Sequence, residues 1–369
     1  MRSRIAVFVA VVQVILFAGH WLLYETLRFF AAAGGRGEIS AAAWTIGILS
    51  VSFVAASLLA FRYHARAVRW FYTAAAVWLG AFSFFFFAAI SCWLIYFVVS
   101  LAGVGAHKQW IAMICFGVAA VASVLAVVNA MWTRVRRIRV KLPHLPEIWR
   151  GRTAALISDL HLGHVWHLGF VRRIVRMIGR LEPSIVWISG DLYDGTAVEA
   201  ERVAAPLLEL KAPLGAFFVE GNHEEFRDPT RFLNAIRGAG VRVLDNEKTD
   251  VDGLQIVGVP YRHATHADHF RRVLESIDVD RGRASVLLTH APDQVGVAEA
   301  AGIGLQVSGH THLGQIVPWT WLARRIYRRF VYGLHRIGKM LVYTSSGAGT
   351  WGPPLRLGSS PEIVLIEFE

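Results

Sequence analysis

Side chains that could bind a metal recur in five short stretches after residue 150, four of which contain glycine. The stretches read "ISDLHLG", "ISGDLYDG", "VEGNHEE", "LLTHAPD" and "VSGHTHLG". Their candidate ligands are Asp159, His161, Asp191, Asn222, His290, His310 and His312. Carboxylate, imidazole and amide oxygen donors without a thiolate suit Mn²⁺, Fe or Zn²⁺ better than a soft metal. Both cysteines, Cys92 and Cys115, lie in apolar runs, which argues against a disulfide framework or a cysteine zinc site.

The spacing of these residues indicates how they could act together. Residues two apart in an extended chain project to the same side, so Asp159 with His161, or His310 with His312, could chelate one ion. Each motif alone is weak, but their joint occurrence in this order is hard to reach by chance. With so many donors, one carboxylate can bridge two ions. Two ions can clamp the attacking and leaving oxygens of a phosphoryl displacement.

Each stretch follows a predicted strand, and the strands alternate with amphipathic helices. We expect strands at 153–158, 184–189, 215–219, 241–244, 253–259, 285–288, 305–308, 340–345 and 362–369. We expect helices at 170–180, 198–210, 229–237, 268–277 and 293–301. This alternation predicts an α/β domain with layered sheets. The five loops could converge on one site, because ligands gather outside the carboxyl ends of strands in open α/β sheets.

The motifs resemble those of the calcineurin-like metallophosphoesterases, whose pattern is DxH, GDxxD, GNHE, H and GHxH. This chain has D-L-H, GDLYD, GNHE, TH and GHTH at the matching places. The resemblance runs from about Ala154 to the C-terminus. The ending "GTWGPPLRLGSSPEIVLIEF" is similar to that of a membrane-tethered bacterial subgroup.

The resemblance implies a four-layer α-β-β-α sandwich that holds two divalent metals, with manganese expected first and iron or zinc as alternatives. It implies one metal position formed by Asp159, His161 and His312 and a second formed by Asn222, His290 and His310, with Asp191 bridging the two. It places His223 near the scissile phosphate, to stabilise or protonate the leaving group. In such enzymes a metal-bound hydroxide attacks phosphorus. Asp194 could orient a ligand or simply shape a turn, and both interpretations stay open.

The first third of the chain predicts a membrane domain, because 54% of all residues are hydrophobic and the mean hydropathy is +0.43. Four apolar runs reach the roughly 20 residues that a span needs. They lie at about 5–30, 41–61, 72–104 and 110–132, and together predict an all-α four-helix transmembrane domain at 1–133. The third run is too short for two spans and a turn, so we expect one long helix. Gln13, His20 and Asn129 favour hydrogen bonds between helices over a transport pathway.

Basic residues predict the orientation. Arginine and lysine cluster before span one, between spans two and three, and after span four, which are the same side of a four-span topology. By the positive-inside rule we expect the phosphoesterase domain at 153–369, after a basic linker at 134–152, to face the cytoplasm of a bacterial inner membrane. The net charge of +11 then suits anionic lipid, and nucleic acid is the less favoured partner.

The segment "PWTWLARRIYRRF" bears on the substrate. It predicts a helix that contacts a membrane or substrate through Trp319, Trp321, Leu322, Arg324, Arg325, Ile326, Arg328, Arg329 and Phe330. The alternative is a helix that packs on the domain's own core. A second histidine-rich stretch, "RHATHADH", favours a surface loop over a third metal site.

Three functions compete. The first is a membrane-bound phosphohydrolase that cleaves a phosphodiester or pyrophosphate of a lipid-linked or amphiphilic substrate, for example a UDP-acyl-sugar. The second is a phosphodiesterase for a soluble nucleotide-type substrate, with the membrane part only a tether. The third is a membrane sensor or scaffold without activity.

Overall fold

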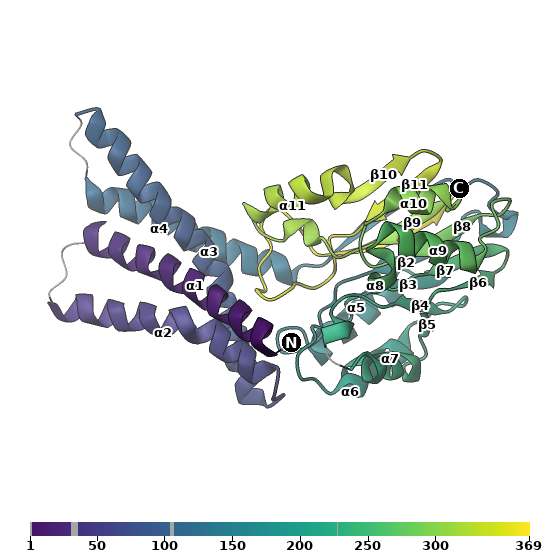
Figure 1. Cartoon of the computed structure of the whole chain (residues 1–369), viewed down its shortest axis with the longest axis horizontal. Helices are drawn as coiled ribbons and strands as arrows, with labels where there is room; N and C mark the ends of the chain where they lie inside the picture. Colours follow the sequence, from purple (N-terminus) through teal and green to yellow (C-terminus); the bar gives the residue numbers. More distant parts are fainter. Residues whose placement is uncertain (1, 31–35, 104–106, 227) are drawn as a thin grey trace. The chain divides into compact units, whose positions relative to one another are not determined.

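The protein forms two compact units in a computed structural model that describes residues 2–30, 36–103, 107–226 and 228–369 (Figure 1). One unit comprises Met1–Val128 together with Gly352–Leu355. The other comprises Asn129–Trp351 and Arg356–Glu369. The predicted division into a helical part and an α/β part is therefore present, although the boundary falls earlier than residue 153.

Long apolar helices make up the first unit. They are α1 (Arg2–Phe30), α2 (Arg36–Ala60), α3 (Arg66–Leu101) and α4 (Lys108–Met131). All four are long and apolar enough to cross a membrane. The third is one continuous helix of 36 residues, as expected, and the predicted end of its span at residue 104 lies outside the described residues.

Polar side chains in this unit bond between helices, which is the role predicted for two of them. Gln13 of α1 donates to the backbone carbonyl of Ser50 in α2 at 3.0 Å. His20 of α1 accepts from Trp78 of α3 at 3.0 Å and lies 2.7 Å from the carbonyl of Leu16. Hydrogen bonds of this kind stabilise the contact between helices, because no water is available inside a membrane to bind these polar groups. Asn129, the first residue of the second unit, does not make the predicted bond between helices, because it donates to the carbonyls of Arg356 and Ser359 within its own unit.

Two six-stranded sheets form the second unit. The first sheet has the order β1 (Arg134–Val140), β12 (Glu362–Phe368), β2 (Thr153–Ile157), β3 (Ile185–Ser189), β4 (Ala216–Val219) and β5 (Arg242–Leu244). The second has the order β10 (Gly333–Ile337), β11 (Met340–Thr344), β9 (Leu305–Ser308), β8 (Ser285–Leu288), β7 (Leu254–Gly258) and β6 (Glu247–Val251). Strands β2 to β5 are parallel to one another, and so are β7, β8, β9 and β11.

Helices cover the outer faces, which completes the expected four layers. The outer side of the first sheet packs with α5 (Leu168–Gly179), α6 (Ala200–Ala204), the short η2 (Ala205–Glu209) and α7 (Pro229–Gly238). The outer side of the second packs with α9 (Ala267–Ile277) and α10 (Val295–Ala300), while α8 (Tyr261–Ala264) precedes α9. In β2, Ala155 and Ile157 point to the helices, and Ala154 and Leu156 point to the other sheet. Both faces are buried, which is why these strands read as continuous apolar runs.

The predicted basic linker at 134–152 is wrong. Residues Arg134–Val140 form an edge strand that pairs in parallel with β12, from Arg134 opposite Glu362 to Val140 opposite Phe368. Further on, Trp149 in η1 (Glu147–Trp149) is fully buried between the sheets, and its indole donates to the carbonyl of Val251 at 3.0 Å. The arginines of β1 obscured the strand, but an exposed edge commonly carries basic residues that discourage pairing with another chain.

Replacing Trp149 tests this correction. Trp149→Ala removes a ring that packs edge-on against Phe368 at 5.3 Å and should cost about 3–5 kcal/mol of unfolding free energy. The measurement is pulse proteolysis of the full chain across a urea series in detergent. The neighbouring Ile148→Ala, at an exposed position, should change stability by less than about 0.5 kcal/mol. If both variants changed stability by an equally small amount, the interpretation of residues 134–152 as a linker would stand.

Candidate metal centre

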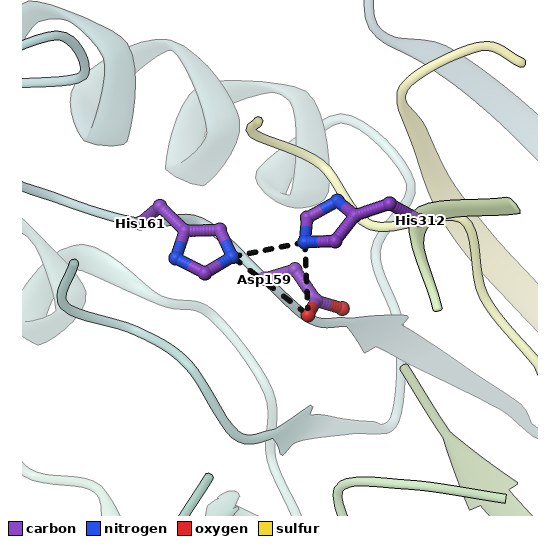
Figure 2. A group of neighbouring side chains, drawn as sticks. All are labelled: Asp159, His161 and His312. Atoms are coloured by element: carbon purple, nitrogen blue, oxygen red, sulfur yellow. Dashed lines mark hydrogen bonds and ion pairs between the residues drawn. The ribbon is translucent and has the colours of Figure 1, made fainter. Parts of the chain in front are cut away.

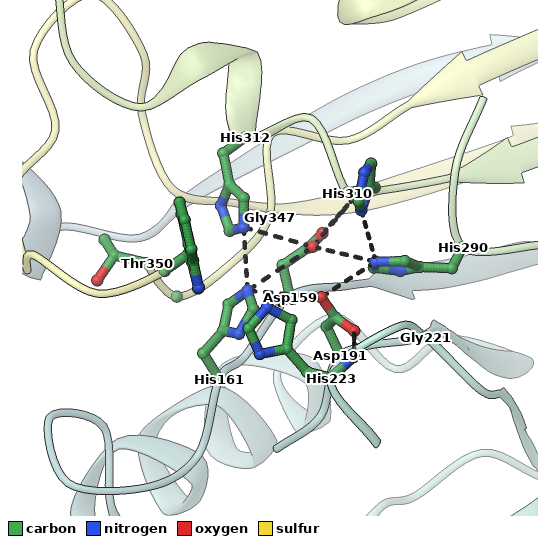
Figure 3. A network of polar contacts seen from close by, with 12 residues as sticks. Asp159, His161, Asp191, Gly221, His223, His290, His310, His312, Gly347 and Thr350 are labelled. Atoms are coloured by element: carbon green, nitrogen blue, oxygen red, sulfur yellow. Dashed lines mark hydrogen bonds and ion pairs between the residues drawn. The ribbon is translucent and has the colours of Figure 1, made fainter. Parts of the chain in front are cut away.

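All seven predicted ligands lie in loops at the carboxyl ends of strands. Asp159 and His161 follow β2, Asp191 follows β3, and Asn222 follows β4. On the second sheet His290 follows β8, and His310 and His312 follow β9, with His312 opening the short η4 (His312–Gly314). Parallel strands end at the same edge of a sheet, so the fold brings these loops together. Figure 3 shows the imidazoles gathered around the carboxylates of Asp159 and Asp191.

The backbone at these ligands is unusual. Positive φ angles occur at Asp159 (52°), His161 (47°), Asp191 (52°), His310 (69°) and His312 (48°). A residue other than glycine in this region carries strain of about 1–3 kcal/mol, and such residues cluster where a side chain must be aimed. The strained backbone of these loops costs local stability, and it directs the ligand side chains toward the common site.

One group of ligands comprises Asp159, His161 and His312, whose ligating atoms lie within 4.8 Å of one another (Figure 2). The Nε2 atoms of His161 and His312 face each other at 3.0 Å. Oδ1 of Asp159 lies 3.5 Å from Nε2 of His312 and 3.9 Å from Nε2 of His161. Three donors thus point at one place, as expected for the first metal position.

A second group comprises Asp191, His290 and His310. Nε2 of His290 lies 3.1 Å from Oδ2 of Asp191 and 3.2 Å from Nδ1 of His310. The other nitrogen of His290 donates to the carbonyl of Ser189 at 2.8 Å, which leaves Nε2 as the nitrogen facing the group. A backbone acceptor behind the ring is the usual support of a metal-binding histidine.

Asp191 stands between the two groups. Its Oδ2 also lies 3.8 Å from Nε2 of His161 in the first group and 3.9 Å from Nε2 of His223. Burial alone would raise the pKa of Asp191, but His290, His223 and His161 hold it below the usual range. An ionised carboxylate at this place has the position that a bridging ligand requires.

The donors fit divalent metals by two further observations. Oδ1 of Asn222 is buried and has no hydrogen-bond partner, although a buried acceptor rarely stays unpaired. Burial also lowers the pKa of His310 to about 3, and it lowers the pKa values of His161 and His312 below their usual range. The rings are therefore neutral, which is the form that binds a metal. Together these donors match the ligand set of a divalent metal ion.

His223 lies at the edge of the site with one nitrogen free. Its Nδ1 lies 3.0 Å from the carbonyl of Asp194, and its backbone N–H donates to Oδ1 of Asp191 at 2.9 Å. A carbonyl can only accept, so Nδ1 carries the proton and Nε2 faces the site. His161, Asp191 and His223 also lie within 4.8 Å of one another, so geometry makes His223 a candidate ligand as well. Its role at the leaving group stays a prediction.

Asp194 orients His223 by its backbone. The carboxylate of Asp194 accepts from the backbone N–H and the hydroxyl of Thr196 at 2.8 and 2.6 Å. These bonds shape the turn, and the carbonyl of the same residue supports His223. The bonds to Thr196 fit the turn interpretation, and the orientation of a metal ligand by Asp194 stays a prediction.

Glu224 is a residue of the site to which the sequence assigned no role. Its fully buried carboxylate accepts from the backbone N–H groups of Gly221, Asp191 and Tyr193 at 2.9, 3.1 and 3.0 Å. It therefore ties the loop after β3 to the loop after β4. Its place in "GNHE" was the available signal, but its bonds go to backbone atoms that no sequence pattern reveals.

The predicted membrane helix is shorter than expected. The helix α11 (Trp319–Tyr327) ends where Arg328 adopts a φ of 52°, and the separate turn η5 (Arg328–Val331) follows. Phe330 is half-buried and packs against the core of the second sheet, and its membrane contact stays a prediction. Ala323 and Tyr327 pack with Leu313 of the site loop. The other predicted contact residues are exposed and stay a prediction: Trp319, Trp321, Leu322, Arg324, Arg325, Ile326, Arg328 and Arg329.

Comparison with known proteins adds independent support. A family model described as calcineurin-like phosphoesterase matches residues 153–314. An uncharacterized metallophosphoesterase of Aquifex aeolicus is 32% identical over 244 residues, which are 64% of this chain and 92% of that protein. One of Campylobacter jejuni is 30% identical over 248 residues, 65% of each chain. A transmembrane protein with metallophosphoesterase domain of Danio rerio is 31% identical over 68% of this chain and 60% of its own length. The chain thus spans less than two thirds of the latter two relatives.

Replacing Asp191 tests the shared ligand. We expect the full chain to bind two Mn²⁺ ions and Asp191→Asn to weaken both, because the amide loses the charge that lies between the groups. A loss of about 10–100-fold in affinity is typical when a metal site loses a supporting group, and a bridging ligand should cost at least that. The measurement is calorimetric titration with Mn²⁺ in detergent. Asp194→Asn, the same change at a buried carboxylate three residues away, should retain both ions. If Asp191→Asn bound Mn²⁺ as tightly as the wild type, Asp191 would not be a metal ligand.

Proposed function

The chain belongs to the calcineurin-like metallophosphoesterase family, and from this premise we propose that it is a dinuclear metal-dependent phosphohydrolase with an amphiphilic substrate. The substrate class is a phosphodiester or pyrophosphate joined to an apolar group, of which a UDP-acyl-sugar is one example. The donor set at the ends of β2, β3, β4, β8 and β9 supports the reaction. The surroundings of His223 support the substrate class.

Two divalent ions at this site would supply Lewis acidity toward the phosphate oxygens and an activated water. The chain's own residues have two tasks beside that. Asp159 and Asp191 would supply the negative charge that holds the ions, and the imidazoles of each group would complete the donor set. The free Nε2 of His223, fixed by the carbonyl of Asp194, is placed to hold a proton for the departing oxygen.

The observation that carries the substrate class is a pair of exposed aromatic rings beside His223. The ring of Phe226 lies 4.4 Å from the imidazole and that of Trp351 lies 6.3 Å from it. Their side chains are 54% and 60% exposed. Gln315 holds the backbone of Trp351 on both sides, donating to its carbonyl and accepting from its N–H. A fixed apolar rim around a polar phosphate site suits a substrate that has both characters.

The helix α11 supports a substrate presented from a lipid surface. It follows the loop that carries His310 and His312, and the ring of Tyr327 at its end lies 6.2 Å from the ring of His310. On its outer side Trp321, Leu322 and Ile326 are at least half exposed beside exposed arginines. Apolar and basic residues together are typical of a helix in a membrane interface. The chain also carries membrane-capable helices, and we propose that the catalytic unit faces the cytoplasm, on the side of the basic clusters.

The aromatic pair also favours a second candidate, a soluble nucleotide whose base stacks on Trp351 or Phe226. The two candidates differ in what α11 does. A soluble nucleotide would make no contact with the exposed apolar side chains of α11, whereas a bilayer would bury them.

Removing the aromatic rim tests the substrate class. We expect Phe226→Ser and Trp351→Ser each to lower kcat/KM for a lipid-linked pyrophosphate in vesicles by about 10–100-fold, the effect of about 1.5–3 kcal/mol of lost apolar burial. Hydrolysis of a small aryl phosphodiester should change by less than threefold, because that substrate ends near the metals. The measurement is phosphate or alcohol release with Mn²⁺. Equal losses on both substrates, or a preference for a soluble dinucleotide over every lipid tried, would contradict the proposal.

Replacing the outer residues of α11 tests presentation from a membrane. Leu322→Ser with Ile326→Ser should lower activity on substrate in vesicles by at least about 30-fold and leave activity on the same substrate in dilute detergent unchanged, since each side chain contributes on the order of 1–2 kcal/mol to interfacial binding. Leu334→Ser, at a partly exposed leucine of β10, is the matched control and should have no effect in vesicles. Unchanged vesicle activity in the α11 variant would remove its interfacial role.

A further inference from the structure

Arg356 is a fully buried arginine that lies directly behind one of the metal ligands. Its side chain has no exposed surface, and no carboxylate forms an ion pair with it among the described residues. Lysine and arginine are almost never buried so completely without a charged partner. Burying a guanidinium costs several kcal/mol unless hydrogen bonds and nearby opposite charge offset the loss of water, and here the carboxylates of Asp159 and Glu362 favour the charged form beyond ion-pair distance. The position of this charge therefore needs an explanation in terms of what it contacts.

The contacts of Arg356 converge on His312. Nη1 donates to the backbone carbonyl of His312 at 2.9 Å, and Nη2 lies 3.0 Å from Nδ1 of the same ring. The bond to the carbonyl fixes the backbone of His312, which sets the direction in which its side chain leaves the turn. A neutral ring that binds a metal through Nε2 carries its proton on Nδ1, so Nη2 packs beside that nitrogen and the carbonyl is the group of His312 that Arg356 binds. Nε2 of the ring faces His161 and Asp159 in the first metal group.

The same guanidinium also holds the loop on the other side of Asp159. Nη2 donates to the carbonyls of Ser346 and Gly349 at 2.7 and 2.6 Å. Between them Gly347 passes so close that a Cβ there would lie 2.8 Å from Cβ of Asp159. Arg356 therefore joins the turn that carries His312 to the loop that packs on Asp159.

The turn that carries His312 needs such a clamp. His312, Leu313 and Gln315 all have positive φ angles, of 48°, 51° and 60°. Strained residues persist only where neighbouring groups hold them. The carbonyl of His312 is bonded to Arg356, and the carbonyl of Gln315 accepts from Ser359 at 2.8 Å, a residue that Arg356 also contacts at 3.2 Å.

We propose that Arg356 is a positioning residue of the first metal position, where it fixes the ring of His312 relative to Asp159 and His161. The inference rests on the metal centre of the proposed function but not on its substrate, because metal binding is measured without one. Groups that orient metal ligands typically contribute 10–100-fold in metal affinity.

The experiment compares Arg356→Met and Arg356→Lys with the wild-type full chain in detergent. Methionine keeps the length and removes the charge. Lysine keeps the charge, but one ammonium group cannot reach His312 and both loop carbonyls together. Mn²⁺ titration should show two ions for the wild type, and in both variants one of them weakened about 10–100-fold. Electron paramagnetic resonance at two equivalents of Mn²⁺ should change from an exchange-coupled pair to a largely mononuclear signal.

Two controls separate this effect from general loss of stability. Arg173→Met removes an arginine that donates to the carbonyl of Met131 at 2.8 Å, outside the metal groups, and should keep both ions and the coupled spectrum. In a His312→Ala background, Arg356→Met should weaken Mn²⁺ binding no further, because the residue through which it acts is gone. Thermal unfolding of each protein without metal reports folding directly.

The outcomes are distinct. A wild-type chain that binds fewer than two Mn²⁺ ions overturns the proposed metal centre itself. A wild-type chain that binds two, with either Arg356 variant binding both at wild-type affinity and with an unchanged spectrum, overturns the role of Arg356 alone. Additive losses in the His312→Ala background also overturn it.

Discussion

Two buried carboxylates impose the condition on which the rest of the catalytic unit depends. Asp159 has no exposed surface and Asp191 has almost none. An ionised carboxylate is stable at such a depth only beside positive charge or strong donors. Burial opposes protonation of His290, yet Asp191 and Asp159 raise its pKa to about 10, while the rings of His161 and His312 stay neutral. One imidazolium is modest compensation for two carboxylates, and divalent ions held by neutral rings would complete it.

The fold meets this condition in two ways: loops from both sheets converge on the site, and strained backbone in those loops turns the ligands toward it. Parallel strands in two facing sheets end at one edge, so loops distant in sequence come within reach. Each loop must then turn sharply, and five of the predicted ligands have a positive φ. The strain of these turns is offset by buried groups that bind backbone atoms. Glu224 collects three N–H donors of the loops after β3 and β4, and Arg356 binds carbonyls of the turn at His312 and of the loop at Ser346. Glu224 binds backbone N–H groups and Arg356 binds backbone carbonyls, so each holds two loops of the site together.

The sequence predicts the parts whose signals are local. Apolar runs such as "SIVWIS" indicate strands buried on both faces, and "GHTH" and "GNHE" identify the donors. The parts it misses depend on distant partners. The run "RVRRIRV" is a strand only because β12 lies beside it. Arg356 is 44 positions from the histidine that it holds, and no periodicity connects them. The helical wheel drawn for this segment is valid only as far as Tyr327, because the helix ends at Arg328 and Phe330 packs against the core of the second sheet.

The two sides of α11 link the chemistry of the site to the question of where its substrate comes from. On the inner side Ala323 and Tyr327 pack with Leu313, the residue next to His312, so this helix is part of the wall of the metal centre. On the outer side Leu322 and Ile326 remain in contact with solvent, at a free-energy cost of about 1–2 kcal/mol each relative to burial. A domain that worked only on solutes would gain nothing from that exposure. On a chain with membrane-capable helices, we propose that this exposed face docks beside lipid while the opposite face of the same helix packs on the loop that carries the ligands.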